Sequence, residues 1–148
     1  MSGLVFVDTN VLLYAVDVGD KRKHDAAMAW RRRLWETRQG RVSFQVLQEF
    51  YVNVFRKWPQ SLDSARVEIL DLFAWQPVVI SAEILKSSWK IQDRYGISFW
   101  DALIVAAAKS SNCSFLLSED FQSAFDFGGL RVINPFRAQP NDIIPPDL

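Results

Sequence analysis

The chain is poor in the residues that build disulfides and zinc sites. It has 148 residues but one cysteine, Cys113, and one histidine, His24. An internal disulfide is therefore impossible, and two such ligands cannot complete a zinc site. Any metal bound by this sequence would have to be a hard cation held by oxygen atoms.

Long apolar runs and a net charge are also missing. No apolar stretch approaches the ~18 residues of a membrane span, and the first apolar run, Leu4–Val7, ends at Asp8 instead of extending into a secretory leader. We therefore expect a cytoplasmic protein with no membrane segment. The 17 basic and 17 acidic residues cancel, which argues against a uniformly basic nucleic-acid-binding surface.

The zero net charge conceals a segregation of charge. Between Lys21 and Lys57 there are 10 basic and 3 acidic residues, so this segment carries +7 and the rest of the chain −7. Such asymmetry indicates a polyanion or an acidic protein as partner. A solvated helix face would have the same composition, and that alternative stays open.

Short apolar segments alternate with helical patterns along the chain, and 49% of the residues are hydrophobic, enough for a substantial core. Strands separated by helices predict a parallel sheet covered on both faces, hence a single α/β/α sandwich. We expect one domain over residues 1–136 and a proline-containing C-terminal tail, extended or loose, over 137–148. The predicted strands are residues 4–7, 42–44, 77–80, 115–117 and 131–133.

Four acidic side chains fall at or just beyond the carboxyl ends of predicted strands, where ligands of open parallel sheets bind. Asp8 ends the first strand and Asp120 follows the fourth, while Glu49 and Asp101 lie in the first turns of helices near the same edge. Each also has an ordinary structural explanation. Asp8, Asp101 and Asp120 could belong to helix starts, and Glu49 could be a solvated side chain.

The convergence of these carboxylates is more informative than any one of them. Two like charges about 4 Å apart repel by roughly 4 kcal/mol at an effective dielectric of 20, so several carboxylates gathered together require protonation or a compensating cation. A set of Asp and Glu oxygens without His or Cys suits Mg²⁺ or Mn²⁺. The usual chemistry of such a cluster is phosphodiester hydrolysis.

Four short motifs carry a family resemblance. They are VDTNVLLY at 7–14, QEFY at 48–51, SFWDALI at 98–104 and LSED at 117–120. Over about residues 4–136 the chain resembles the PIN-domain nucleases and, more narrowly, the VapC-type toxins of bacterial and archaeal toxin–antitoxin pairs. One departure follows the last motif, where relatives often have Gln-His-Gly and this chain has Gln122-Ser123-Ala124.

The resemblance implies a five-stranded parallel sheet and Mg²⁺- or Mn²⁺-dependent endoribonuclease activity. It also implies a homodimer and a cognate VapB-type antitoxin whose peptide lies across the active groove. By matching motif, the metal ligands and catalytic residues would be Asp8, Glu49, Asp101 and Asp120. Asn10 and Ser118 match polar positions that orient those ligands.

An RNA substrate or an acidic antitoxin segment would account for the basic region. The candidate contacts are Arg22, Lys23, Arg32, Arg33, Arg56 and Lys57. The aromatic residues of segment 30–58 suggest a hydrophobic groove for the antitoxin or a dimer surface, although they could equally line the core.

Three other functions fit parts of the pattern. A haloacid-dehalogenase-like phosphatase would need a carboxylic acid where Asn10 stands. A receiver domain would need a lysine near Asn134-Pro135. A PIN-like interaction module without catalytic activity remains the non-enzymatic alternative.

Overall fold

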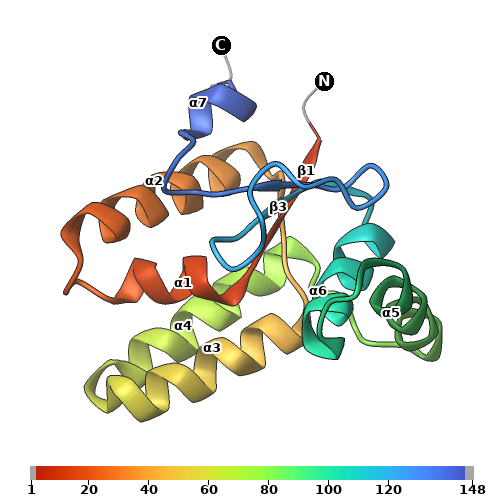
Figure 1. Ribbon diagram of the computed structural model, residues 1–148. Helices are drawn as coiled ribbons and strands as arrows, with labels where there is room; N and C mark the ends of the chain where they lie inside the picture. Colours follow the sequence, from red (N-terminus) through yellow and green to blue (C-terminus); the bar gives the residue numbers. More distant parts are fainter. Residues whose placement is uncertain (1–2, 146–148) are drawn as a thin grey trace.

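The computed structural model describes residues 3–145 and has a four-stranded parallel sheet at its centre (Figure 1). The strand order is β2-β1-β3-β4, with bounds β1 (Leu4–Val7), β2 (Gly40–Arg41), β3 (Cys113–Leu117) and β4 (Arg131–Ile133). Val5, Phe6 and Val7 are all buried. Because successive strand side chains point to opposite faces, both faces of β1 are covered, as the continuous apolar composition predicts.

Helices fill the connections from β1 to β2 and from β2 to β3, whereas a loop without a helix joins β3 to β4 (Figure 1). In that figure α3 and α4 run side by side, and α5 packs beside α6 at the other end of the sheet. α6 is buried from Ala102 to Ala108, so its apolar sequence packs inside the molecule. The helix bounds are α1 (Thr9–Val16), α2 (Lys21–Thr37), α3 (Phe44–Lys57), η1 (Pro59–Ser61), α4 (Leu62–Leu72), η2 (Phe73–Trp75), α5 (Ala82–Tyr95), α6 (Phe99–Ser110) and α7 (Pro140–Ile143).

The predicted five-stranded sheet is wrong in strand number, although an α/β fold with a parallel sheet is confirmed. Segment 77–80 contributes only an isolated parallel bridge between Ser43 and Val78 within the described residues. Two hydrogen bonds make that bridge, from the Val78 N–H to the Val42 carbonyl and from the Phe44 N–H to the Val78 carbonyl. The ladder stops there because Ser43 caps α3 by accepting the Val46 N–H at 3.2 Å, so the chain turns into a helix.

The C-terminal segment packs more closely than an extended tail would. Ile144 is fully buried, and the Arg33 guanidinium donates to its carbonyl. The Trp30 indole Nε1 donates to the carbonyls of Pro135 and Ala138, both at 3.1 Å. The expectation of a loose tail is therefore corrected for residues 137–145, which α2 holds against the core. Residues 146–148 lie outside the described part.

None of the helices between residues 3 and 145 combines the length and the apolar composition needed to span a lipid bilayer.

Candidate active site

Asp8 lies buried where β1 passes into α1. Its Oδ1 accepts the Thr9 N–H at 2.8 Å, so it caps α1, and its Oδ2 accepts the Ser118 hydroxyl at 2.8 Å. Burial raises the pKa of Asp8 to about 6; the hydrogen bonds from Ser118 and Thr9 act in the opposite direction, and the charges of Asp120 and Glu49 raise it further. The carboxylate of Asp8 therefore caps α1 and also belongs to the acidic site.

Asn10 ties the end of β1 to the loop after β3. Its side-chain Nδ2 lies within hydrogen-bond distance of Asp8 Oδ2 (3.3 Å), Ser118 Oγ (3.1 Å) and Asp120 Oδ2 (3.1 Å). Its Oδ1 accepts the Glu119 N–H at 3.3 Å. One amide therefore stands between two carboxylates from distant parts of the chain, and it fixes their relative position.

Glu49 reaches this edge from α3. Its Oε2 accepts the Thr9 hydroxyl at 2.9 Å, and its Oε1 accepts the Gln45 side-chain amide at 3.1 Å. Gln45 is itself buried, and its Oε1 has no hydrogen-bond partner among residues 3–145. Thr9 and Gln45 were not among the sequence candidates; Gln45 stands one helical turn before Glu49, which is the only local sign of the contact.

Asp101 lies in the first turn of α6, where Ser98 Oγ accepts the Asp101 N–H at 3.1 Å and caps the helix. Burial raises the pKa of the Asp101 carboxyl, its hydrogen bond with Ser98 lowers it, and the charges of Asp120 and Glu49 raise it. The same two carboxylates therefore act on Asp8 and on Asp101. Side chains from α1, α3, α6 and the loop after β3 share one electrostatic site at the carboxyl ends of the strands.

The donor chemistry of this site suits a hard divalent cation, because it offers carboxylate oxygens and no soft ligand. Within residues 3–145, however, no three Asp, Glu, His or Cys side chains are grouped so that they could hold one ion. The carboxylates are oriented by neighbouring hydrogen-bond donors, as Glu49 is by Thr9 and Gln45. Coordination of one ion by all four residues remains a prediction, whereas the structure shows hydrogen bonds that link Asp8 to Asp120 through Asn10 and to Glu49 through Thr9.

The basic candidates divide into those with partners inside the fold and those without. Lys23 pairs with Glu119 at 2.9 Å, Arg22 donates to the Phe136 carbonyl at 3.1 Å, and Arg33 holds Ile144. The exposed candidates with neither an ion pair nor a side-chain hydrogen bond to another described residue are Arg32, Arg56 and Lys57. Lys57 lines a depression together with Asn10 and Glu119, so it lies at the mouth of the site.

The aromatic residues of segment 30–58 are divided between core and surface. Trp30 and Phe50 are buried in the core, whereas 57% of Phe55 is exposed. Between α3 and α4 the exposed side chains border an apolar groove of about 290 Å³. Its lining consists of Phe44, Leu47, Gln48, Tyr51, Val52, Ile69 and Phe73.

Three solved structures resemble this fold. A toxin–antitoxin complex from Klebsiella pneumoniae aligns with a TM-score of 0.62 at 20% identity, covering 88% of this chain and 97% of that chain. The sarcin–ricin loop cleaving toxin VapC20 of Mycobacterium tuberculosis gives 0.60 at 23% identity, covering 84% and 91%. VapBC2 from Rickettsia felis, bound to a DNA fragment from its promoter, gives 0.57 at 19%, covering 87% and 96%.

These identities establish a common fold and nothing further, and no curated protein sequence matches the chain. The family assignment comes from the sequence itself, since the PIN domain model matches residues 5–126, which include all four acidic positions and the amide of Asn10. The chain belongs to the PIN domain family.

Proposed function

We propose that this protein is a divalent-metal-dependent endoribonuclease and the toxin of a VapC-type toxin–antitoxin pair. The observation that supports the proposal is the hydrogen-bond network that joins Asp8 to Asp120 through Asn10 and to Glu49 through Thr9. The charges of Asp120 and Glu49 also raise the pKa of Asp101. Membership of the PIN domain family removes the phosphatase and receiver-domain alternatives. A PIN module without activity is the remaining alternative.

In this proposal the four carboxylates hold Mg²⁺ or Mn²⁺. When bound there, such a cation would supply a water of lowered pKa as the nucleophile and would offset charge on the phosphate. Asn10 and Ser118 keep Asp8 and Asp120 in place through the hydrogen bonds described above. Thr9 and Gln45 do the same for Glu49 from the opposite side.

RNA as substrate is favoured by the basic residues around this acidic centre. Lys57 borders the depression that contains Asn10, and Arg56 is exposed on the same last turn of α3. Phosphate groups that approach four carboxylates need such positive charge nearby to offset the repulsion. The structurally similar VapC20 is described as a sarcin–ricin loop cleaving toxin, which also favours RNA as the substrate.

An antitoxin as partner is favoured by the apolar groove between α3 and α4. Val52 and Phe73 in this groove are 51% and 47% exposed, which is unusual for large apolar side chains gathered in one place. A VapB-type segment seated there would bury them, and a homodimer through the same surface is the second possibility. A protein that acts on RNA in this way would work in the cytoplasm.

The proposed active site is tested by removing one charge at a time. We expect Asp8→Asn and Asp101→Asn to reduce RNA cleavage by about 10²-fold or more, because each removes an anionic oxygen from the centre. Asp93→Asn, at an exposed position on α5, is the matched control and should retain wild-type cleavage. The measurement is the cleavage rate of total RNA with Mg²⁺ or Mn²⁺.

The circular dichroism spectra of all variants should match that of the wild type, which separates loss of activity from loss of fold. Wild-type cleavage by both site variants would refute the acidic centre. A wild-type protein that cuts no RNA with either metal, yet still binds an antitoxin, would favour the inactive interaction module.

A further inference from the structure

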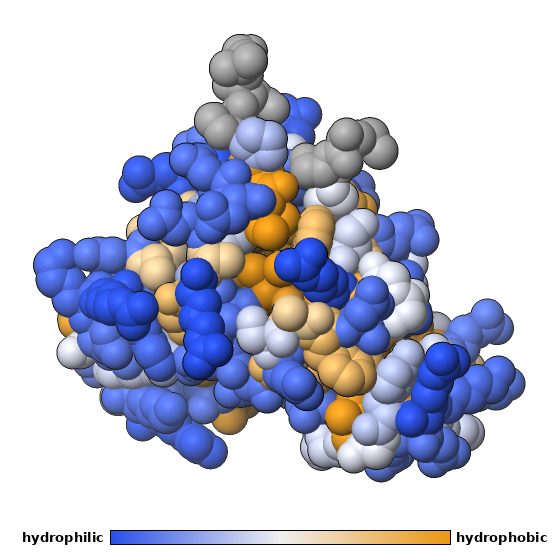
Figure 2. Space-filling model, turned by 45° about the horizontal axis from the view of Figure 1, so that its top comes forward, coloured by the Kyte–Doolittle hydropathy of each residue, from blue (hydrophilic) through white to orange (hydrophobic). Residues whose placement is uncertain are grey.

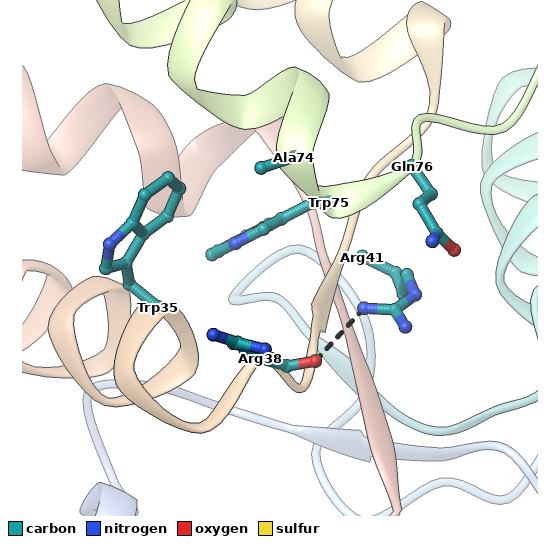
Figure 3. A pocket seen from close by; sticks show the side chains of 6 residues that line it. All are labelled: Trp35, Arg38, Arg41, Ala74, Trp75 and Gln76. Atoms are coloured by element: carbon teal, nitrogen blue, oxygen red, sulfur yellow. Dashed lines mark hydrogen bonds between the residues drawn. The ribbon is translucent and has the colours of Figure 1, made fainter.

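A second cavity lies away from the carboxylates, between the C-terminal end of α2 and η2 (Figure 3). Its volume is about 530 Å³, which lies within the usual range of small-molecule sites. The side chains that line it come from α2, β2, η2 and the residue after η2: Trp35, Arg38, Arg41, Ala74, Trp75 and Gln76. Trp75 belongs to the core at 3% exposure, whereas Trp35 is 43% exposed and stands beside two guanidinium groups in the same cavity.

The cavity is at the opposite edge of the sheet from the acidic centre. Arg38 follows the last turn of α2 and immediately precedes β2, so it lies at the amino end of that strand. Asp8, in contrast, follows the carboxyl end of β1, which runs parallel to β2. Figure 2 brings the amino-terminal edge forward and shows an apolar band between two hydrophilic flanks. Whatever binds here does not compete directly for the carboxylates.

The two arginines of this cavity carry charge that nothing nearby neutralises. Neither Arg38 nor Arg41 has a carboxylate within ion-pair distance among residues 3–145. Arg41 donates through Nη1 to the carbonyls of Arg38 (3.2 Å) and Gly40 (2.7 Å), which fixes its guanidinium at the cavity wall. Arg31, on α2 and about two turns before Arg38, is instead paired with Glu68. Arg38 and Arg41 therefore make the cavity positively charged, and it is suited to an anionic ligand.

Two indole rings lie next to these arginines. Trp35 is 43% exposed, and the Arg31 guanidinium rests 4.8 Å from its ring centroid, held there by Glu68. In Figure 3 the Trp75 indole points toward Trp35, and the Arg38 side chain runs below it. Gly40 makes room for this indole, because a Cβ at that position would lie 2.6 Å from the Trp75 ring.

We propose that this cavity binds a nucleotide, with the flat base against the exposed Trp35 indole and the phosphate on Arg38 and Arg41. A nucleotide is the ligand class that supplies a π face and a phosphate together, and base–indole stacking and guanidinium–phosphate pairing are both favourable. An acidic peptide would satisfy the arginines but leave the indole without a flat partner. The nucleotide comes either from solution or from an RNA strand, and neither source depends on the cleavage reaction.

The experiment measures binding of AMP by calorimetry and of a fluorescein-labelled RNA oligonucleotide by anisotropy, both in an Asp8→Asn background that leaves RNA intact. We expect Arg38→Gln/Arg41→Gln to weaken binding at least about tenfold and Trp35→Ala about fivefold or more. Arg131→Gln, an exposed arginine at the start of β4 outside the cavity, is the matched control and should change affinity less than about twofold. Thermal melting confirms that each variant is folded.

The AMP and RNA measurements distinguish a free nucleotide from an RNA strand as the ligand. Tight AMP binding that RNA does not displace identifies a free nucleotide as the ligand, whereas RNA binding sensitive to the same substitutions identifies a strand. The proposal is overturned if neither ligand loses affinity in the cavity variants. It is also overturned if inorganic phosphate or poly-glutamate displaces AMP as well as AMP itself does, because charge alone would then explain the binding. RNA cleavage by the variants with Asp8 restored reports separately on the proposed nuclease.

Discussion

At the scale of single residues, the acidic centre depends on side chains that serve the fold and the site together. Asp8 caps α1 and is also the most buried member of the carboxylate group. Ser98 caps α6 and thereby sets the position of Asp101. A helix start therefore accounts for Asp8 and for Asp101 taken alone, but not for Glu49, which lies within α3, or for Asp120, which no helix directly follows.

The buried carboxyl of Asp8 predicts a dependence of stability on pH. Its pKa is raised from 3.8 to about 6, so the native protein binds this proton more tightly than the unfolded chain. The ionised form consequently costs stability: the cost is absent below about pH 4, grows as the pH rises and is complete above about pH 6. In a metal-free buffer, Asp8→Asn should be more stable than the wild type at pH 7.5 by on the order of 3 kcal/mol.

Urea unfolding of both proteins between pH 4 and pH 8 measures this difference. The gap should close toward the acidic end, and the exposed-site variant Asp93→Asn should follow the wild type throughout. A gap of constant size at all pH values would mean that the titration of Asp8 is not its origin.

The strand-end places of Asp8 and Asp120 could be predicted from the sequence, and so could Asn10 and Ser118 beside them, but the groups that hold Glu49 could not. Asp8 and Asp120 follow strands, and strands are recognisable by their apolar composition. The contact of Thr9 with Glu49 joins residues 40 positions apart and depends on how α3 packs against α1. No local pattern encodes such packing.

At the scale of the elements, the difference between local sequence pattern and tertiary packing also explains why the predicted number of strands is wrong. The apolar composition of residues 42–44 and 77–80 is that of strands, yet Ser43 begins α3 and the paired strand is Gly40–Arg41. Gly40 has low strand propensity, but it is needed there because the Trp75 indole covers it. Tertiary packing overrides local preference at this edge.

The groove between α3 and α4 gives a prediction about partners. Val52→Glu or Phe73→Glu places a charge among apolar side chains and should weaken antitoxin binding at least about tenfold. Val79→Glu, at a position 67% exposed outside the groove, is the control. Antitoxin binding is measured by calorimetry. Light scattering of the protein without antitoxin tests whether a second copy of the chain occupies the groove. A change of mass from dimer to monomer in the groove variants, with antitoxin affinity unchanged, would assign the groove to dimerisation.

The C-terminal segment gives a prediction about stability. Ile144 is fully buried beside α2, so Ile144→Ala should lower the free energy of unfolding by about 3 kcal/mol. The matched control is Val18→Ala, at a position 75% exposed, where a loss below about 0.5 kcal/mol is expected. Chemical denaturation reports both values. Equal stability of the two variants would show that the segment beyond residue 137 contributes little to the core.

At the scale of the whole molecule, a bound cation should stabilise the native state, because a ligand that binds only the folded protein shifts the unfolding equilibrium. Mg²⁺ or Mn²⁺ at 100 times its dissociation constant adds about 2.7 kcal/mol, or several degrees in the melting temperature. Asp8→Asn/Asp101→Asn should lose this increase, and a chelator should reverse it in the wild type. An identical rise in both proteins would point to a metal site elsewhere.

The architecture also has a consequence for synthesis of the chain. The hydrogen bond from Ser118 to Asp8 spans 110 positions, and β3 pairs directly with the first strand. Nascent polypeptide that ends before β3 has β2 beside β1 but lacks the strand on the other side of β1 and the loop that carries Asp120. Ribosomes that stall early on this message would therefore release fragments with an incomplete acidic centre, and nuclease competence would arise only near the end of translation.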